Sequence, residues 1–337
     1  LEYAPEESVI ALVTHDSFLT ANGHRELRRY ILDTCRIHNL HLCPTNLFLN
    51  QGADVRTCVL ILEKTRDKKG KVNVSNRPAS IDEFRRILQN EAFQQYPLED
   101  LLLDDSRDSS EFVIGVPKQI AALFGERRLS EVAPCITGIS TGEDKKYLRS
   151  EQSNEFSIPF YKNPASRKFY AAPDGYLCSN YDEVGRTVSN FMIRNKELIF
   201  RGGLSCSSMG VKFGATIRPK DSACGVNPNV IIEDERRWWL LSFLNSRLCL
   251  YVTRGVIIRG NMITAGYASR IPVPQLDKKT LQLLASFGVA GFETARSGNS
   301  ISKIKAAIDD TIEDALDLSV DTRTLLGEFE QDSTRLA

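Results

Sequence analysis

Three short apolar runs within the first 62 residues constrain the fold more strongly than any other feature of the sequence. The run at 9–13 is continuous, which is typical of a strand buried on both faces. The runs at 37–42 and 55–62 alternate or are rich in β-branched residues, and both predict strands. Apolar residues at helical spacing within 22–35 predict a helix between the first two strands. We therefore expect the tail of a doubly wound α/β sheet, too short to be a complete one.

In the remainder of the chain, the pattern of apolar runs and turn residues changes near residue 134. Residues 64–77 are polar and contain glycine, which predicts a loop or hairpin. From 134 to 274, short strand-like runs alternate with Gly, Pro, Asn and Asp, a pattern typical of a mixed α+β region. Helices are predicted outside the N-terminal sheet at 81–89, 117–124, near 235–248 and throughout 278–337.

Composition excludes several classes of protein. Hydrophobic residues make up 42% of the chain and charged residues 26%, as in ordinary globular proteins. No apolar run approaches the roughly 18 residues that a membrane helix needs, so no membrane partner is expected. The chain opens without a signal peptide and without an initiator Met, which indicates a piece of a longer polypeptide. Its eight cysteines form no C-x-x-C pair, so we expect reduced thiols and a cytoplasmic location.

A net charge of zero conceals an uneven distribution along the chain. Residues 145–275 carry 19 Lys and Arg against 10 Asp and Glu. Residues 1–144 carry 17 against 22, and residues 276–337 carry 7 against 11. A polyanion such as nucleic acid would be attracted to the middle segment, although a basic surface can also serve solubility alone.

One cluster of soft metal ligands stands near the N-terminus. Cys35, His38, His41 and Cys43 are residue types that zinc accepts. However, His38 and His41 lie three apart on an expected strand and would point to opposite faces. A tetrahedral site would require that strand to break, so we expect no metal here.

Other catalytic patterns are weak or missing. The sequence contains no G-x-S-x-G elbow, no G-x-G-x-x-G turn and no P-loop. Glu143-Asp144-Lys145 matches the E-x-K of metal-dependent nucleases, but three residues in a Gly-bounded turn are expected by chance. Motif chemistry alone therefore assigns no activity.

Several segments, taken in order, resemble adenine-N6 DNA methyltransferases of restriction-modification systems. Residues 11–20 and 25–32 resemble the strand, turn and helix that follow the catalytic loop of that family, and residues 52–64 resemble its late hairpin strand. Residues 136–148, which begin Ile136-Thr137-Gly138-Ile139-Ser140-Thr141-Gly142, resemble the loop that opens the family's TaqI-like specificity domain. The helix, closing strand and helical tail of that domain resemble residues 241–248, 270–274, 304–310 and 316–318.

Two expected features of that family do not occur in this sequence. Such enzymes carry an Asn-Pro-Pro-aromatic loop that holds the adenine amino group, and Asn163-Pro164-Ala165 and Asn227-Pro228-Asn229 lack its second Pro and aromatic residue. They also carry a glycine-rich turn for S-adenosylmethionine. His15 stands where a Pro is usual. The resemblance thus implies no catalytic residue and no bound cofactor in this chain alone, with S-adenosylmethionine used by the complete enzyme.

The resemblance implies a fold and a division of the chain. We expect an α/β part with a partial Rossmann-like methyltransferase sheet at 1–128. An α+β target-recognition domain at 129–276 and a helical tail at 277–337 would follow. The expected function is sequence-specific recognition of double-stranded DNA, with one flipped adenine presented to a catalytic half outside the chain. That half would be an upstream segment or a separate methylase subunit.

Candidate site residues follow from the same resemblance and from the basic middle segment. Phe48 is the candidate for stacking on the flipped base, which returns part of the few kcal/mol that flipping costs. Arginines beside glycines suit guanine readout, and lysines suit phosphates. The candidate DNA-binding residues are Lys145, Lys146, Arg149, Lys162, Arg167, Lys168, Arg201, Lys212, Arg218, Arg254 and Arg259.

Two other classes of protein stay open. The chain could be a recognition-only specificity subunit that binds DNA and a separate methylase. The strands within 9–62 argue against this, because a pure reader has no use for them. It could also be a complete enzyme of other chemistry, which a closed cleft with convergent carboxylates or Cys and His side chains would favour.

Overall fold

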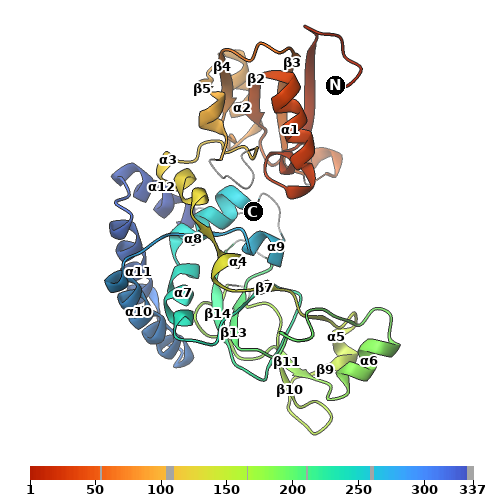
Figure 1. Ribbon diagram of the computed structural model, residues 1–337, viewed down its shortest axis with the longest axis vertical. Coiled ribbons are helices and arrows are strands. Elements are labelled where there is room, and N and C mark those ends of the chain that lie inside the picture. Colours follow the sequence, from red (N-terminus) through yellow and green to blue (C-terminus); the bar gives the residue numbers. More distant parts are fainter. Residues whose placement is uncertain (54, 104–109, 165, 210–211, 259–261, 332–337) are drawn as a thin grey trace. The chain divides into compact units, whose positions relative to one another are not determined.

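The computed structural model describes residues 1–53, 55–103, 110–164, 166–209, 212–258 and 262–331. The chain divides into two compact units, which we call unit 1 (Leu1–Gly125) and unit 2 (Glu126–Ala337). Mixed α/β structure with several small sheets fills the two units (Figure 1). Among the described residues, no helix is long and apolar enough to cross a membrane.

Unit 1 is built on a five-stranded mixed sheet with the order β1-β3-β2-β4-β5. Its strands are β1 (Val9–His15), β2 (Cys35–Leu42), β3 (Thr57–Lys64), β4 (Lys71–Ser75) and β5 (Gln94–Pro97). β1 and β2 both run antiparallel to β3, and β4 runs parallel to β2. Its helices are α1 (Arg25–Thr34), α2 (Ile81–Gln89) and α3 (Lys118–Ala122). The strands expected at 9–13, 37–42 and 55–62 and the helix at 81–89 are therefore present.

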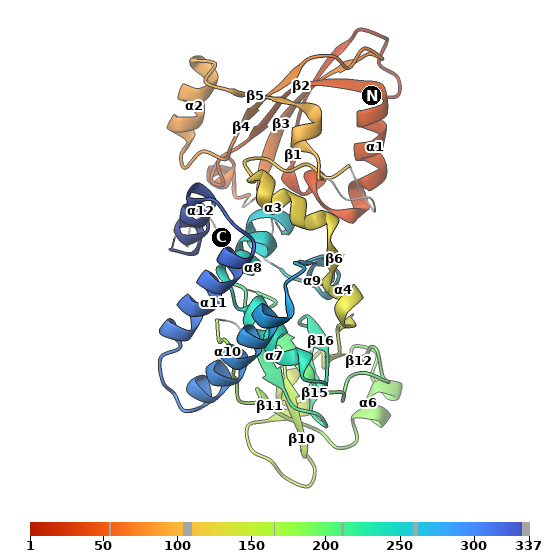
Figure 2. The same cartoon turned by 60° about the vertical axis from the view of Figure 1, so that its left-hand side comes forward.

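Helix α1 closes one core of unit 1 (Figure 2). Its Ile31 is buried with Leu40 of β2 and Leu62 of β3. Arg28, on the same helix, is fully buried and donates from Nη1 to the carbonyl oxygens of Phe18 and Ala21 at 2.9 and 2.7 Å. Apolar spacing and one buried guanidinium thus fix α1 against the sheet and against the turn before it.

The burial expected for the first strand is wrong. β1 pairs with β3 alone within the described residues, so it is an edge strand. Val9 is 67% exposed and Val13 is 60% exposed. A continuous apolar run predicts burial on both faces, but here nothing in the described chain covers the outer face and edge. The same run therefore leaves an apolar edge in contact with solvent.

The polar segment at 64–77 contains a strand that its composition conceals. Val72 and Val74 of β4 are buried and alternate with Lys71 and Asn73, which is the period of a strand. β4 pairs with β2 on one side and with β5 on the other. The expectation of a loop or hairpin was therefore incomplete, because two buried valines are too few to form an evident apolar run.

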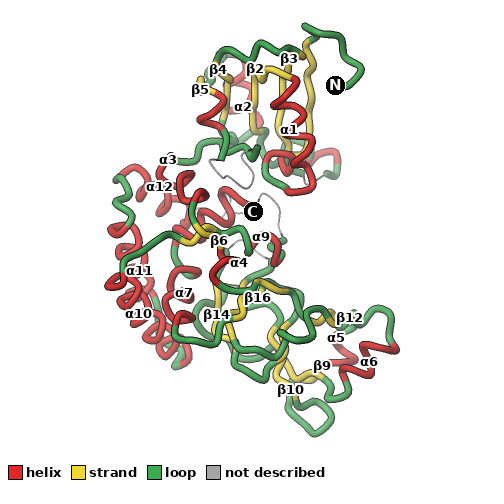
Figure 3. The backbone as a smooth tube through the Cα atoms, in the orientation of Figure 1, coloured by secondary structure: helices red, strands yellow, loops and turns green. Residues whose placement is uncertain are grey.

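Among its described residues, unit 2 contains four small sheets. Long connections join them (Figure 3). Its strands are β6 (Arg127–Arg128), β7 (Cys135–Ile136), β8 (Ile139–Ser140), β9 (Leu148–Arg149), β10 (Ile158–Tyr161), β11 (Gly175–Leu177), β12 (Met192–Ile193), β13 (Gly203–Cys206), β14 (Ala215–Arg218), β15 (Ala223–Cys224), β16 (Asn229–Ile231) and β17 (Pro272–Val273). The sheet orders are β15-β10-β11-β9, β14-β13-β16-β7, β12-β8 and β17-β6.

The last three of the helices in unit 2 form the C-terminal segment, and all the helices described there are given next with their bounds. They are α4 (Leu129–Val132), α5 (Asp144–Tyr147), α6 (Tyr181–Thr187), α7 (Arg236–Leu244), α8 (Arg247–Tyr251), a π-helix (Val252–Ile257), α9 (Ala265–Ala268), α10 (Lys278–Arg296), α11 (Ser302–Ala315) and α12 (Val320–Gln331). α10 packs closely on α7. Ser242 Oγ of α7 donates to the carbonyl oxygen of Leu284 in α10 at 2.7 Å. A Cβ on Gly288 would lie 2.1 Å from the carbonyl oxygen of Trp238, so only glycine allows this approach.

The single helix expected near 235–248 is interrupted. α7 ends at Leu244, and the side-chain amide of the next residue, Asn245, pairs with both main-chain groups of Ala215 in β14. Its Oδ1 accepts from the amide of Ala215 at 3.0 Å, and its Nδ2 donates to the carbonyl oxygen of Ala215 at 2.9 Å. Ser246 then caps α8 by accepting from the amide of Cys249. Two polar residues inside an apolar pattern thus break the helix.

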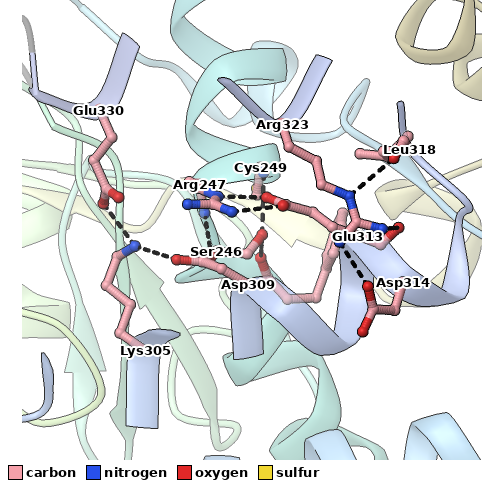
Figure 4. A network of polar contacts seen from close by, with 11 residues as sticks. Ser246, Arg247, Cys249, Lys305, Asp309, Glu313, Asp314, Leu318, Arg323 and Glu330 are labelled. Carbon is pink, nitrogen blue, oxygen red and sulfur yellow. Dashed lines mark hydrogen bonds and ion pairs between the residues drawn. The ribbon is translucent and has the colours of Figure 1, made fainter. Parts of the chain in front are cut away.

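An ion-pair network joins α8 to α11 and α12 (Figure 4). The Arg247 guanidinium of α8 pairs through two nitrogens with the buried Glu313 carboxylate of α11. Asp309 accepts from the amide of Arg247 at 2.7 Å and pairs with Lys305, which also reaches Glu330 of α12 at 2.6 Å. The C-terminal helices are therefore attached to the rest of unit 2 by buried charges.

Candidate functional site

In unit 1, polar side chains gather where three strands end. β1, β2 and β4 run in the same direction, so their carboxyl ends meet at one edge of the sheet. Asp16 follows β1 there and is fully buried. Arg77, which follows β4, pairs with the Asp16 carboxylate and donates a second hydrogen bond to the carbonyl oxygen of Cys43, just after β2. One guanidinium thus ties the segments after all three strands together.

The loop between β2 and β3 carries Phe48, the candidate for base stacking. The loop is fixed at its base, where the amide of Cys43 donates to the carbonyl oxygen of Thr57 at 2.9 Å. Phe48 precedes a 3-10 turn, Leu49–Gln51, which Gly52 closes with a φ of +77°. The Phe48 side chain is half-buried and its neighbour Leu49 is 54% exposed. Phe48 thus lies on a surface loop and outside the buried core of unit 1.

The residues considered as zinc ligands have other partners. His41 stacks on Phe93 with ring centroids 4.4 Å apart, and its Nδ1 lies 3.1 Å from Ser75 Oγ. Burial lowers the pKa of His41 to about 4. His38 instead contacts Glu63 at 2.8 Å. Within the described ranges, no group of three or more His, Cys, Asp or Glu side chains is arranged to hold a metal ion.

In unit 2, three candidate DNA-binding residues lie together on the surface. Lys145, Lys146 and Arg149 are exposed on α5 and β9. Lys146 Nζ lies 5.2 Å from the centre of the Tyr147 ring, and the Arg149 guanidinium lies 4.4 Å from the centre of the Phe156 ring. We call these three cations the α5 patch. All three side chains are exposed, and aromatic rings lie beside two of them, Lys146 and Arg149.

Three other candidates form ion pairs within the chain. Lys162 pairs with Asp144, Arg167 pairs with Asp174 at 3.3 Å, and Arg201 pairs with Glu233 at 2.7 Å. All three cations keep exposed side-chain area, so they can still reach a ligand. An exposed ion pair is worth little, and a phosphate could replace the carboxylate.

Two arginines proposed as DNA contacts are buried, which the sequence did not indicate. Arg218 is 1% exposed, and its guanidinium donates to the carbonyl oxygens of Ile199, Arg201 and Ser222. Arg254 is 4% exposed within the π-helix. Charge in a sequence does not reveal burial, and both guanidiniums lie inside unit 2. Their burial leaves almost no side-chain area for a ligand at the surface, and contact of either residue with DNA stays a prediction.

The remaining candidates occupy different surroundings. Lys168 donates to the carbonyl oxygen of Asn245 at 3.1 Å, and burial, with Lys305 nearby, lowers its pKa to about 8. Lys212 is exposed on the connection between β13 and β14. Arg259 lies outside the described residues. The structure therefore brings together the α5 patch but not the whole expected set.

Three connections of unit 2 meet beside Ser208, a grouping that sequence patterns did not indicate. The amide of Ser208 donates to Asn163 Oδ1 at 3.1 Å, and its carbonyl oxygen accepts from the amide of Ile263 at 2.7 Å. Asn227, fully buried, donates to Ser205 Oγ at 2.7 Å and to the carbonyl oxygen of Cys206 at 3.1 Å. Segments far apart in the chain are thus held in one loop cluster, 163–164, 207–209 and 262–264. The only hint in the sequence was the concentration of Gly, Asn and Ser there.

Comparisons with known proteins relate both units to restriction-modification enzymes. Residues 1–113 match the family model described as N-6 DNA Methylase. The N-terminal third resembles an N-6 DNA methylase. No curated protein matches the chain. The DNA complex of MmeI, a type IIL restriction-modification enzyme, has the same fold, with a TM-score of 0.56 and 10% identity over 97% of this chain and 50% of that one.

Two further structures are similar to a lesser degree. A nuclease-deletion mutant of LlaGI, a type ISP restriction-modification enzyme, has a TM-score of 0.49 and 11% identity over 86% of this chain and 35% of that one. BpuSI, a type IIG restriction endonuclease, has a TM-score of 0.31 and 14% identity over 93% of this chain and 47% of that one. The chain spans about half the length of MmeI, so the activity of a whole enzyme does not transfer to it directly.

Proposed function

We propose that the chain is the DNA-recognition part of an adenine-N6 DNA methyltransferase from a restriction-modification system. One pairing of observations carries this proposal. Residues 1–113 match N-6 DNA methylases, and 97% of the chain shares its fold with MmeI, whose structure contains DNA. In the proposal, residues 1–128 end a methyltransferase domain, residues 129–276 form a TaqI-like target-recognition domain, and residues 277–337 form a helical tail.

The exposed edge of the unit 1 sheet supports a catalytic half outside this chain. β1 has a strand partner on one side only among the described residues, and Val9 and Val13 face solvent. A long apolar edge strand is prone to aggregate unless another element covers it. We infer that the catalytic half continues the sheet at β1, either from the same polypeptide or from a separate methylase subunit. We place the assembly in the cytoplasm, where unpaired cysteines stay reduced.

S-adenosylmethionine would supply the methyl group in the complete enzyme. The described residues of unit 1 do not fit it, because no glycine-rich turn joins a strand to a helix there. The connection from β1 to α1 has one glycine, Gly23, and that residue lies in a 3-10 turn, Asn22–His24. The cofactor therefore belongs to the catalytic half, and no transfer step is assigned to this chain.

The contribution of unit 1 is to position the target base. Phe48 is proposed to stack on the flipped adenine, and stacking on an aromatic ring is worth about 1–3 kcal/mol per base. Arg77 supports that role, because its guanidinium donates to the carbonyl oxygen of Cys43 and so anchors the base of the loop that carries Phe48. A recognition-only subunit would not need this sheet, so the family match favours the methyltransferase.

Binding to duplex DNA at varied salt tests the proposal. Fluorescence anisotropy with a random duplex should give an affinity that falls steeply with salt, because bound cations release counterions. A variant with Lys145→Ala, Lys146→Ala and Arg149→Ala should lower the slope of log affinity against log salt by about 2–3.

The matched control removes three exposed lysines from the acidic C-terminal segment. Lys278→Ala, Lys279→Ala and Lys303→Ala change the net charge by the same amount and should leave the slope nearly unchanged. Equal losses in both triple variants would show a non-specific charge effect. Absence of binding by the wild-type chain at low salt would overturn the proposal.

A further inference from the structure

Two of the three methionines in the chain lie on neighbouring loops of unit 2 and face solvent. Met209 is 55% exposed and Met262 is 54% exposed. A main-chain hydrogen bond of 2.7 Å from the amide of Ile263 to the carbonyl oxygen of Ser208 joins the two loops. Met209 comes directly after Ser208, and Met262 comes directly before Ile263. Single exposed apolar residues are normal on a protein surface. Here two long, unbranched apolar side chains are exposed next to the hydrogen bond that joins their loops.

The described residues next to each methionine form several hydrogen bonds. Ser208 is bonded to Asn163 as well as to Ile263, and Ser207 bonds to Gly214 across the β13–β14 connection through its amide at 3.0 Å. Past Met262, Thr264 caps α9 by accepting from the amide of Tyr267. These hydrogen bonds hold the described residues on one side of each methionine, which lowers the entropic cost of using the two side chains to bind a partner.

The surroundings of the two methionines are suited to a polyanion with an apolar interior. Lys212 is exposed three residues beyond Met209. Residues 145–275, which include both loops, carry 19 basic against 10 acidic residues. Duplex DNA combines phosphates with stacked bases, and methionine is one of the residues that wedge between base steps.

We propose that Met209 and Met262 form an apolar wedge that contacts the base stack of duplex DNA, with Lys212 on a neighbouring phosphate. The inference rests on the proposed function and deepens it, because it names side chains that unstack or distort the target. Thioether side chains are flexible and polarisable, so they can fill the space beside an extruded base. Sequence motifs did not identify either residue.

Methionine oxidation with dilute peroxide, followed by mass spectrometry, tests the wedge directly. The third methionine, Met192 in β12, is 43% exposed and serves as the internal control. A saturating random duplex should slow sulfoxide formation at Met209 and Met262 several-fold and leave Met192 unchanged. Unchanged rates at Met209 and Met262 in the DNA-bound chain would overturn the inference. So would protection that depends on protein concentration and not on DNA.

Affinity measurements separate this inference from the proposed function. The double variant Met209→Ala and Met262→Ala should bind duplex about tenfold more weakly with the same salt slope, since apolar contacts release no counterions. Met192→Ala should bind like the wild type. If the double variant also binds like the wild type, the wedge is wrong while DNA recognition stands. If the wild-type chain does not bind duplex at low salt, both proposals fail.

Discussion

The two units of this chain reach a fixed structure by different means. Unit 1 rests on long strands whose apolar residues face one core, such as Leu40, Leu60 and Leu62. Unit 2 rests on strands of two to four residues, which bury too little apolar surface to hold their own positions. Buried polar side chains such as Arg218, Asn227 and Asn245 supply the missing connections there. Apolar periodicity describes unit 1, whereas unit 2 depends on individual hydrogen bonds.

This comparison predicts its largest effect at the buried ion pair between α8 and α11. Arg247→Ala leaves the Glu313 carboxylate, 1% exposed, without its charged partner. An uncompensated buried charge costs about 3–5 kcal/mol, measured as the loss in free energy of unfolding in urea. Arg186→Ala removes an arginine of α6 whose side chain is 71% exposed, and it should leave the unfolding midpoint unchanged. Similar midpoints for both variants would contradict a structural role for buried charge in unit 2.

Unit 1 should respond to pH through His41, whose folded-state pKa is lowered to about 4 by burial. Because the unfolded chain binds the proton at a pKa near 6.5, stability is full above about pH 6.5 and falls as the pH drops towards 4. The total loss is on the order of 3 kcal/mol. His41→Gln should remove this part of the pH dependence. The measurement is the free energy of unfolding in urea at several pH values between about 4 and 6.5. An identical slope in the variant would show that His41 is not the cause.

A smaller effect is expected at the amide that joins α7 to β14. Asn245→Ala leaves the amide and carbonyl of Ala215, which are buried, without these partners, at a cost of about 1–3 kcal/mol. Asn154→Ala replaces an exposed asparagine of the same unit and should not change thermal unfolding. The carbonyl oxygen of Ala215 keeps the amide of Phe169 as a partner at 2.8 Å, so most of the cost comes from the Ala215 amide. If Asn245→Ala unfolds at the same temperature as the wild type, the Asn245 side chain does not stabilise unit 2.

The sequence predicted the elements that rest on apolar patterns and missed those that rest on individual contacts. The strands β1 to β3 and the helices α1 and α2 were predicted because each carries a continuous or periodic apolar pattern over several consecutive residues. β4 was missed because only Val72 and Val74 carry its pattern. The break at Asn245 was missed because its reason is a partner, Ala215, thirty residues away. The division of the chain at 128 and 276 stays a prediction.

The candidate site was predicted in part, for reasons that are also physical. Charge counting located the basic segment, and the structure gathers Lys145, Lys146 and Arg149 at its surface. The same counting included Arg218 and Arg254, since formal charge carries no information about burial. Met209 and Met262 escaped notice because exposure of an apolar residue depends on how distant loops meet. Contact of any of these residues with DNA stays a prediction.

The smallest effect is expected at the edge of the unit 1 sheet, and it tests the inferred catalytic half. Val13→Thr, at a side chain that is 60% exposed, should change the stability of this chain by less than about 0.5 kcal/mol. Val72→Thr, at a side chain that is 2% exposed, introduces a buried hydroxyl and should cost roughly 1–3 kcal/mol. In an assembly where another strand covers β1, Val13 becomes a buried position, so Val13→Thr should then approach the cost of Val72→Thr. If its effect stays small after the catalytic half is added, the sheet does not continue at β1, and the partner must attach elsewhere on unit 1.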